Sequence, residues 1–245
     1  MNQVLLYPTG SSESCRYASE ILAKSGVSLT DHLTPDITHL LLDIPTKDCF
    51  SLKELLRRVP KNVTVIGGNL DLSLCAGYRT LDLLKDPYYL AKNAAITADC
   101  ALKVAAPLLK STFADSPALI LGWGRIGKCL AKMLSDLGCP VSVAARKASD
   151  RAMLEALGYR AVDFSEIPSV LNRHTVLYNT VPDLPLHSDI IDDWKTGIAI
   201  DLASEPGMQG NSVIPSRGLP GRYAPESSGR LIADTILSFL KEACL

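Results

Sequence analysis

The stretch Leu119-Ile-Leu-Gly122-Trp-Gly124-Arg-Ile-Gly127-Lys-Cys-Leu-Ala-Lys-Met-Leu134 decides the fold of this chain of 245 residues. An apolar run leads directly into three glycines, and the residues after them follow the period of an amphipathic helix. A second apolar run, Val141 to Ala145, comes after a short break. Strand, glycine loop, helix and strand in this order are typical of a βαβ unit, in which a crossover helix joins two parallel strands.

The three glycines have the spacing Gly-x-Gly-x-x-Gly, and each supplies a different property. Gly122 allows a tight turn from strand to helix, Gly124 lets the backbone approach a pyrophosphate, and Gly127 permits close packing of helix on sheet. The backbone N–H groups at Arg125 and Ile126, where the helix starts, attract negative charge. The loop therefore predicts a dinucleotide-binding site made of these five residues. The alternative is an ordinary glycine-rich turn in an α/β fold.

The end of the second strand bears on which dinucleotide is bound. In NAD-binding units an Asp or Glu about twenty residues beyond the loop binds the ribose hydroxyls and would repel a 2′-phosphate. Ala145, Arg146 and Lys147 stand at that place here, with Ser149 close by. A guanidinium can pair with a phosphate or stack on adenine, so this segment favours NADP, with NAD possible. The alternative is that Arg146 and Lys147 are solvated loop cations.

The rest of the chain alternates short apolar stretches with helical ones, which predicts the α/β class. We expect a C-terminal Rossmann domain with a doubly wound parallel sheet and a smaller N-terminal βα domain of flavodoxin-like type. The expected strands lie at residues 4–7, 38–44, 63–66, 118–121, 141–145, 160–162, 175–178 and 197–202. The expected helices lie at 14–24, 51–58, 126–137 and 150–157.

Three changes of pattern suggest the domain boundaries. Residues 1–90 form the small domain, residues 91–225 form the Rossmann domain, and an Ala-rich helix over 88–110 links the two. Pro225 suits the first turn of a last helix, over 226–245, whose stripe of Ile232, Ile236 and Leu240 would pack back on the first domain. We expect the domains to face each other across a cleft.

Composition narrows the class of partner. The net charge is −1 and no Lys/Arg cluster stands out, so nucleic acid and anionic membranes are not expected partners. The N-terminus lacks a signal peptide pattern and no apolar run reaches spanning length, so a cytoplasmic protein is expected. The seven cysteines are scattered and are expected to be reduced, with one nucleophilic thiol as the alternative. The histidines lack metal-ligand spacing, so no metal site is expected.

Polar segments follow the later strands. Ligands of open α/β sheets bind outside the carboxyl ends of the strands, which directs attention to residues 179–182, 201–207 and 218–225. From these segments we add to the cofactor site Asn179, Thr180, Val181, Leu202 and Ala203. The alternative is that proline and glycine merely punctuate surface loops there.

At these segments the chain resembles the family formed by the A subunits of dipicolinate synthase, which is related to the two-domain 2-hydroxyacid and alanine dehydrogenases. The likeness extends from about residue 84 to the C-terminus. It lies in Tyr88-Tyr-Leu-Ala-Lys-Asn-Ala-Ala-Ile-Thr-Ala-Asp99, the glycine loop through Arg146, Asn179-Thr-Val-Pro182, Asp201-Leu-Ala-Ser-Glu-Pro-Gly207 and Gly218-Leu-Pro-Gly-Arg-Tyr-Ala-Pro225. The pair formed by the last two motifs is the most specific part.

The resemblance implies an NAD(P)-dependent oxidoreductase that converts 4-hydroxy-tetrahydrodipicolinate, or its dehydrated form, to dipicolinate with NADP. It also implies a partner, a flavoprotein-like B subunit, and a place in the mother cell of a sporulating bacterium. We further expect a homo-oligomer. Three features depart from the family pattern: a shorter N-terminal domain, Asp99 where Glu is expected, and Met-Gln-Gly-Asn after Gly207. They bear on the substrate more than on the cofactor.

The reaction type follows partly from a missing residue. A 2-hydroxyacid dehydrogenase needs a histidine in its C-terminal loop as acid and base, yet no histidine follows His187. Aromatisation instead needs hydride transfer and loss of an acidified ring proton, which a carboxylate or water can accept. Asp99 is the candidate proton acceptor.

The other catalytic and substrate-binding candidates are polar residues near the expected cleft. Asn93 and Thr97 would contact the substrate, Ser204 would lie beside the nicotinamide, and Arg222 would bind a carboxylate bidentately. Each has a structural alternative: Asp99 pairs with Lys103, Asn93 and Thr97 bond within their helix, and Arg222 is solvated. Two other functions stay open: a regulatory or scaffold protein that binds NADP without turnover, and an oxidoreductase for another small oxo or imino acid.

Overall fold

The computed structural model describes residues 4–46, 49–182, 188–194 and 197–242. It divides into two compact units, Met1–Asn93 with Pro220–Leu245 and Ala94–Leu219, which we call unit 1 and unit 2. The helix α3 (Pro87–Ala105) passes from unit 1 into unit 2. Each unit is built on one parallel sheet, so the expected α/β class with two βα domains is confirmed. The boundaries after residues 90 and 225 stay a prediction.

Unit 1 contains a five-stranded parallel sheet in the order β2-β1-β3-β4-β5, the flavodoxin-like order. Its strands are β1 (Leu5–Pro8), β2 (Ser28–Leu29), β3 (His39–Leu41), β4 (Thr64–Gly67) and β5 (Arg79–Asp82). Its helices include α1 (Glu13–Lys24), α2 (Cys49–Leu56), the short α8 (Leu219–Tyr223), which begins one residue before the boundary, and α9 (Pro225–Glu242).

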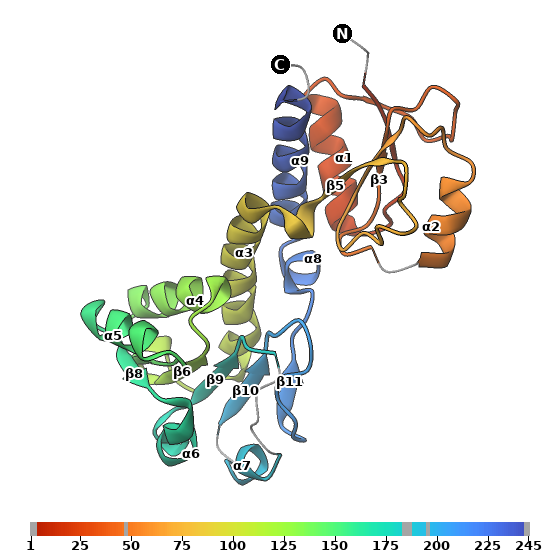
Figure 1. The fold of residues 1–245 in the computed structure, drawn as a ribbon. Helices are drawn as coiled ribbons and strands as arrows, with labels where there is room; N and C mark the ends of the chain where they lie inside the picture. The colour runs from red at the N-terminus through yellow and green to blue at the C-terminus, as the bar shows by residue number, and fades with distance from the viewer. Residues whose placement is uncertain (1–3, 47–48, 183–187, 195–196, 243–245) are drawn as a thin grey trace. The chain divides into compact units, whose positions relative to one another are not determined.

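The helices α1 and α9 lie side by side although they come from opposite ends of the chain (Figure 1). Pro225 begins α9, and Ile232 and Ile236 are buried, as their spacing indicates. Gly229 allows the close approach, because a Cβ there would overlap the carbonyl oxygen of Ser14 and the side chain of Tyr17. The chain therefore returns to unit 1 through a helix shaped for that contact.

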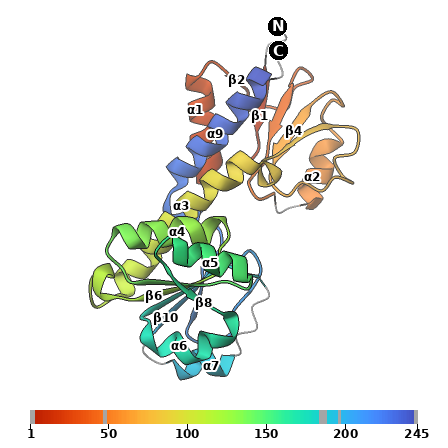
Figure 2. The same cartoon turned by 60° about the vertical axis from the view of Figure 1, so that its left-hand side comes forward.

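Unit 2 contains a six-stranded parallel sheet in the order β11-β10-β9-β6-β7-β8, the doubly wound order of dinucleotide-binding domains. Its strands are β6 (Ala118–Leu121), β7 (Val141–Ala144), β8 (Arg160–Val162), β9 (Val176–Asn179), β10 (Ile198–Asp201) and β11 (Val213–Pro215). The helices α4 (Arg125–Asp136) and α5 (Ala148–Ala156) cover one face, and α6 (Ile167–Val170) and α7 (Ser188–Asp193) cover the other (Figure 2). The strand order reverses between β6 and β9.

Three strands were missed by the sequence patterns, and three were predicted too long, the one over 38–44 most of all. The missed strands β2, β5 and β11 are short and lack a continuous apolar run. The strand expected over 38–44 ends at Leu41, because Asp43 leaves the ladder and accepts hydrogen bonds from the backbone of Ser11 and Ser12. Among the described residues, none of the helices has the length and apolar character needed to cross a bilayer.

Candidate dinucleotide site

The glycine loop joins β6 to α4 at the point where the strand order of unit 2 reverses. Gly122 has φ +101°, which disfavours an L side chain, and a Cβ there would overlap Thr180 and Val181. A Cβ on Gly127 would overlap the carbonyl oxygen of Gly122. These two glycines therefore let the turn, the start of the helix and the β9 loop approach one another closely.

Gly124 has no such internal reason to be glycine. It is the N-cap residue of α4, its backbone is extended, and a Cβ there would meet no atom within 4 Å. Within the described residues, no side chain caps the start of α4, where Arg125 and Ile126 follow. Gly124 and Arg125 are exposed, and an open helix start without a side-chain cap fits a pyrophosphate, because the helix dipole and the first backbone N–H groups favour negative charge.

The segment after β7 forms the second part of this edge. Arg146 is exposed, and its guanidinium lies 5.4 Å from the ring centroid of Phe164. Arg151 fixes the backbone of this segment. Its Nη1 donates to the carbonyl oxygens of Ala145 and Arg146 at 2.9 and 2.8 Å. No carboxylate follows β7 directly, as the sequence indicated. Lys147 is the N-cap residue of α5.

The acidic residue that follows the neighbouring strand β8, Asp163, already forms an ion pair with Arg151. Asp163 follows β8, and its Oδ2 lies 2.8 Å from Nη1 of Arg151. Hydrogen bonds from Ser165 and the charge of Arg151 lower the pKa of Asp163, so it stays ionised and neutralised by its partner. The cationic character of the segment therefore comes from Arg146 and Lys147.

The ends of β9 and β10 make the third part. Asn179 and Asp201 are fully buried side by side, and Nδ2 of Asn179 donates to Oδ1 of Asp201 at 2.8 Å. The Thr180 hydroxyl donates to the carbonyl oxygen of Leu121 at 2.8 Å, which ties the β9 loop to the end of β6. The backbone of Leu202 and Ala203 continues this edge, and both side chains are buried. All thirteen cofactor candidates thus belong to the carboxyl edge of one sheet, to the loops that leave it or to the first turn of α4.

The catalytic candidates are distributed over several elements of the two units. Asp99 is exposed on α3, and its Oδ2 lies 2.9 Å from Nζ of Lys103, which is the structural alternative that the sequence left open. Thr97 is 8% exposed two residues before it, and Asn93 lies at the end of the unit 1 segment. Ser204 is exposed in the β10 loop of unit 2. Arg222 is exposed on α8, with its guanidinium 5.8 Å from the ring centroid of Tyr223. Their catalytic and substrate-binding roles stay predictions.

Three residues of this edge were missed by sequence reasoning: Asp201, Arg217 and Arg151. Asp201 lies in one of the motifs quoted above, but the sequence around an acid at the end of a strand does not show whether its side chain is buried. Arg217 lies near it, with Nη2 3.8 Å from Oδ2 of Asp201 and Nε donating to the carbonyl oxygen of Ala203 at 3.2 Å. Arg151 follows the Arg146 segment by one helical turn, a spacing that could have been noticed.

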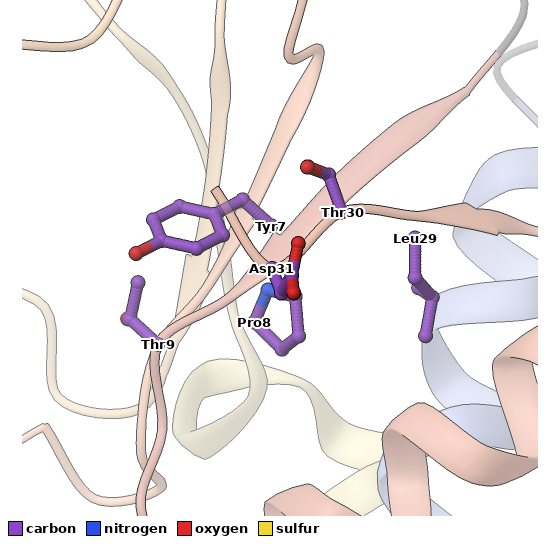
Figure 3. A pocket seen from close by; sticks show the side chains of 6 residues that line it. All are labelled: Tyr7, Pro8, Thr9, Leu29, Thr30 and Asp31. Atoms are coloured by element: carbon purple, nitrogen blue, oxygen red, sulfur yellow. The ribbon is translucent and has the colours of Figure 1, made fainter. Parts of the chain in front are cut away.

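Unit 1 has a hollow of its own at the carboxyl ends of β1 and β2, with a volume of about 710 Å³. Figure 3 shows the six side chains that line it: Tyr7, Pro8, Thr9, Leu29, Thr30 and Asp31. Two of its hydroxyls already donate to backbone carbonyl oxygens, Thr9 to that of Leu41 and Thr30 to that of His32. The six lining residues include the acidic Asp31 and no positively charged side chain, so the hollow does not suit an anionic ligand such as a phosphate or a carboxylate.

With this geometry in view, comparison with known proteins defines the class. Residues 96–195 match the NAD binding domain of D-isomer specific 2-hydroxyacid dehydrogenases. Unit 2 thus contains the nicotinamide-dinucleotide-binding domain of NAD(P)-dependent oxidoreductases. Its sheet order and open glycine loop agree with this class.

The particular resemblance is to the A subunit of dipicolinate synthase, and it is confirmed. The chain is 29% identical to the dipicolinate synthase A subunit of Bacillus subtilis (strain 168) over 141 residues, which are 54% of this chain and 47% of the relative. The match therefore spans about half the length of that relative.

Solved structures show the same fold. The dipicolinate synthase A subunit from Bacillus halodurans aligns over 98% of both chains with a TM-score of 0.81 and 20% identity. A transhydrogenase from Sinorhizobium meliloti aligns over 98% of this chain and 94% of its own, with a TM-score of 0.73 and 15% identity.

Proposed function

We propose that this chain is an NADP-dependent oxidoreductase that acts as the A subunit of a dipicolinate synthase. The observation that carries the proposal is the open, uncapped start of α4 at the switch point of a doubly wound sheet, in a chain that resembles this family. A flavoprotein-like B subunit, a homo-oligomer and a role in the mother cell during sporulation belong to the same proposal.

The proposed reaction removes two hydrogens from a ring. The substrate is 4-hydroxy-tetrahydrodipicolinate, which loses water to give the dehydrated form. Conversion of that form to dipicolinate removes one hydride and one proton. NADP, when bound, would accept the hydride at its nicotinamide and become NADPH, and the proton would be released. The chain's own residues would hold the cofactor and the substrate in position.

The site residues divide this work between them. The glycine loop, with Gly122, Gly124 and Gly127, would hold the pyrophosphate, and the segment Ala145 to Lys147 would bind the 2′-phosphate and adenine. The backbone of residues 179–181 and 202–203 would contact the nicotinamide. For the substrate we retain Asn93, Thr97, Ser204 and Arg222 as polar contacts, with Asp99 as proton acceptor once it leaves Lys103.

Cofactor choice provides the first test. The chain is expected to bind NADP more tightly than NAD, and Arg146→Asp should reverse this preference, because a carboxylate repels a 2′-phosphate and accepts ribose hydroxyls. Dissociation constants for both cofactors, measured by titration calorimetry, check this. Arg173→Asp is the matched control, since Arg173 is exposed before β9, at the amino edge of the same sheet. Equal affinities that Arg146→Asp leaves unchanged would sink the NADP assignment.

Turnover provides the second test. With NADP, freshly prepared 4-hydroxy-tetrahydrodipicolinate and the B subunit, the chain should produce the ultraviolet absorbance of dipicolinate. No product with both subunits and the preferred cofactor refutes the substrate. Cofactor binding without turnover of any dicarboxylate would instead assign a regulatory role.

A further inference from the structure

The carboxylate of Asp201 contacts several segments at the carboxyl edge of the unit 2 sheet. Neither the motifs nor the relatives' names assign it a role. The residue ends β10 and is 2% exposed. Its Oδ1 accepts from Nδ2 of Asn179 at 2.8 Å and from the backbone N of Ala203 at 3.3 Å. Its Oδ2 accepts from the backbone N of Gly207 at 3.0 Å and lies 3.8 Å from the guanidinium of Arg217. Both oxygens thus face donors only.

Asn179 links Asp201 to the loop after β9 through hydrogen bonds to the backbone of Val181. It ends β9, is fully buried, and its Nδ2 also donates to the carbonyl oxygen of Val181 at 2.9 Å, while its Oδ1 accepts from the backbone N of Val181 at 3.0 Å. The loop it fixes packs against Gly122, where a Cβ would overlap Val181. On the other side a Cβ on Gly207 would overlap Nδ2 of Asn179 and the carbonyl oxygen of Val181.

The donor pattern explains why the residue at 201 is an acid and not its amide. An Asn at this position would direct its NH₂ group toward either the Asn179 amide and the Ala203 N–H, or the Gly207 N–H and Arg217. Either orientation sets donor against donor in a buried place. The first loses the two hydrogen bonds to Oδ1, and the second loses the Gly207 hydrogen bond and faces the Arg217 guanidinium. The arrangement therefore suits a carboxylate, whose burial three N–H donors and the nearby Arg217 guanidinium offset.

We propose that Asp201 and Asn179 are a positioning pair that sets the backbone of residues 179–181 and 202–207 at the nicotinamide end of the dinucleotide site. This rests on the proposed binding of a nicotinamide dinucleotide. The adenine end is held by a different residue, Arg151, through the carbonyl oxygens of Ala145 and Arg146. Substitution of either residue of the pair should therefore lower the affinity for a ligand that contains nicotinamide. It should not lower the affinity for a ligand that ends at the adenosine phosphates.

The test compares two ligands on each protein. NADPH spans the whole site, and adenosine 2′,5′-bisphosphate occupies the adenine end alone. Asp201→Asn should weaken NADPH about tenfold or more, because it leaves buried donors facing one another unsatisfied, and should change the bisphosphate affinity less than about twofold. The matched control is Asp192→Asn. Asp192 also accepts a backbone N–H in unit 2, from Asn211 at 2.9 Å in the loop that precedes β11.

Asn179→Ser gives a second variant if Asp201→Asn does not fold, since it removes the same tie without placing donor against donor. The expected result for it is the same split between the two ligands. A merely structural role predicts equal losses for both, and either that outcome or unchanged NADPH binding in a folded variant overturns the proposal. Wild-type protein that binds neither ligand would overturn the proposed function instead.

Discussion

The two units present the same junction, a parallel strand followed by a loop and a helix, with opposite results. In unit 1 the loop between β1 and α1 is internally satisfied: Ser11 and Ser12 donate their backbone N–H groups to Asp43 at 3.0 Å, and the Ser12 hydroxyl caps the N–H of Cys15. In unit 2 the loop between β6 and α4 has no side-chain cap, and Gly124 faces open space.

This difference shows that the edge of a parallel sheet is not sufficient to define an anion site. A carboxylate from the chain itself already occupies the N–H groups of the β1–α1 loop, and Gly10 is packed against Cys15 and Asp43. Among the described residues, no side chain caps the start of α4 at the β6–α4 loop, where we propose that a ligand binds. Substitutions in the two loops should therefore affect different properties, cofactor affinity in one and stability in the other.

The largest expected effect is the loss of cofactor binding in Gly124→Asp. The backbone at Gly124 is extended with φ −81°, and a Cβ meets nothing, so the folded chain should tolerate the substitution. A carboxylate at the helix start would repel the pyrophosphate, and about 4 kcal/mol for like charges 4 Å apart near a protein surface gives a weakening of about 100-fold or more. Calorimetric titration with NADPH measures it, and thermal unfolding checks the fold.

Gly124→Asn is the matched control, because it adds a side chain of the same size without the charge. We expect Gly124→Asn to weaken NADPH binding less than Gly124→Asp does, so that the difference between the two variants measures the charge alone. If Gly124→Asp bound NADPH like the wild type, the uncapped helix start would not be the phosphate site, and the contrast between the two loops would lose its functional meaning.

A smaller effect is expected from Asp43→Ala in unit 1. The change leaves the N–H groups of Ser11 and Ser12 without their carboxylate, and Asp43 is half-buried, so a loss of about 1 kcal/mol in the free energy of unfolding is expected. Hydrogen exchange at the amides of Ser11 and Ser12 should accelerate, and NADPH affinity should stay unchanged. Loss of NADPH affinity, with the fold intact, would contradict the assignment of the two loops to separate roles.

Much of the fold could be predicted from the sequence, because the apolar positions of the local pattern are the ones that the structure buries. The strands Ala118–Leu121 and Arg160–Val162 were predicted at their observed bounds, and both α4 and α9 begin within one residue of expectation. These segments have apolar runs or stripes with clear breaks. The short edge strands β2 and β11 were missed, since two or three residues at a sheet edge are held by their neighbour rather than by their own composition.

The site was readable where it depends on backbone and not where it depends on burial. Glycine spacing predicted the turn at Gly122 and the close packing at Gly127, since those are properties of a residue without a Cβ. The pairing of Asn179 with Asp201 joins residues 22 positions apart and exists only once β9 and β10 lie side by side. No local pattern shows whether a polar residue at a strand end turns inward.

The smallest expected effect separates the units by their response to acid. Burial lowers the pKa of His174 in unit 2 below its ordinary 6.5; the ring contacts the carbonyl oxygen of Val170 at 3.0 Å and the Ser142 hydroxyl at 2.9 Å. Burial, and then the charge of Arg79, lower the pKa of His39 in unit 1. As the pH falls below about 6.5 the unfolded chain takes up these protons before the folded one, so each unit loses stability.

His174→Gln can keep both neutral hydrogen bonds but cannot bind the proton, so it should flatten the pH dependence of unit 2 between about pH 7 and pH 5. His39→Gln should do the same for unit 1 alone. Hydrogen exchange of the buried amides in β6 and β9, compared with those in β1 and β3, reports the two units separately. Equal changes in both units from either single variant would show that they unfold as one body, and the contrast between their two loops would then have to be measured by ligand affinity alone.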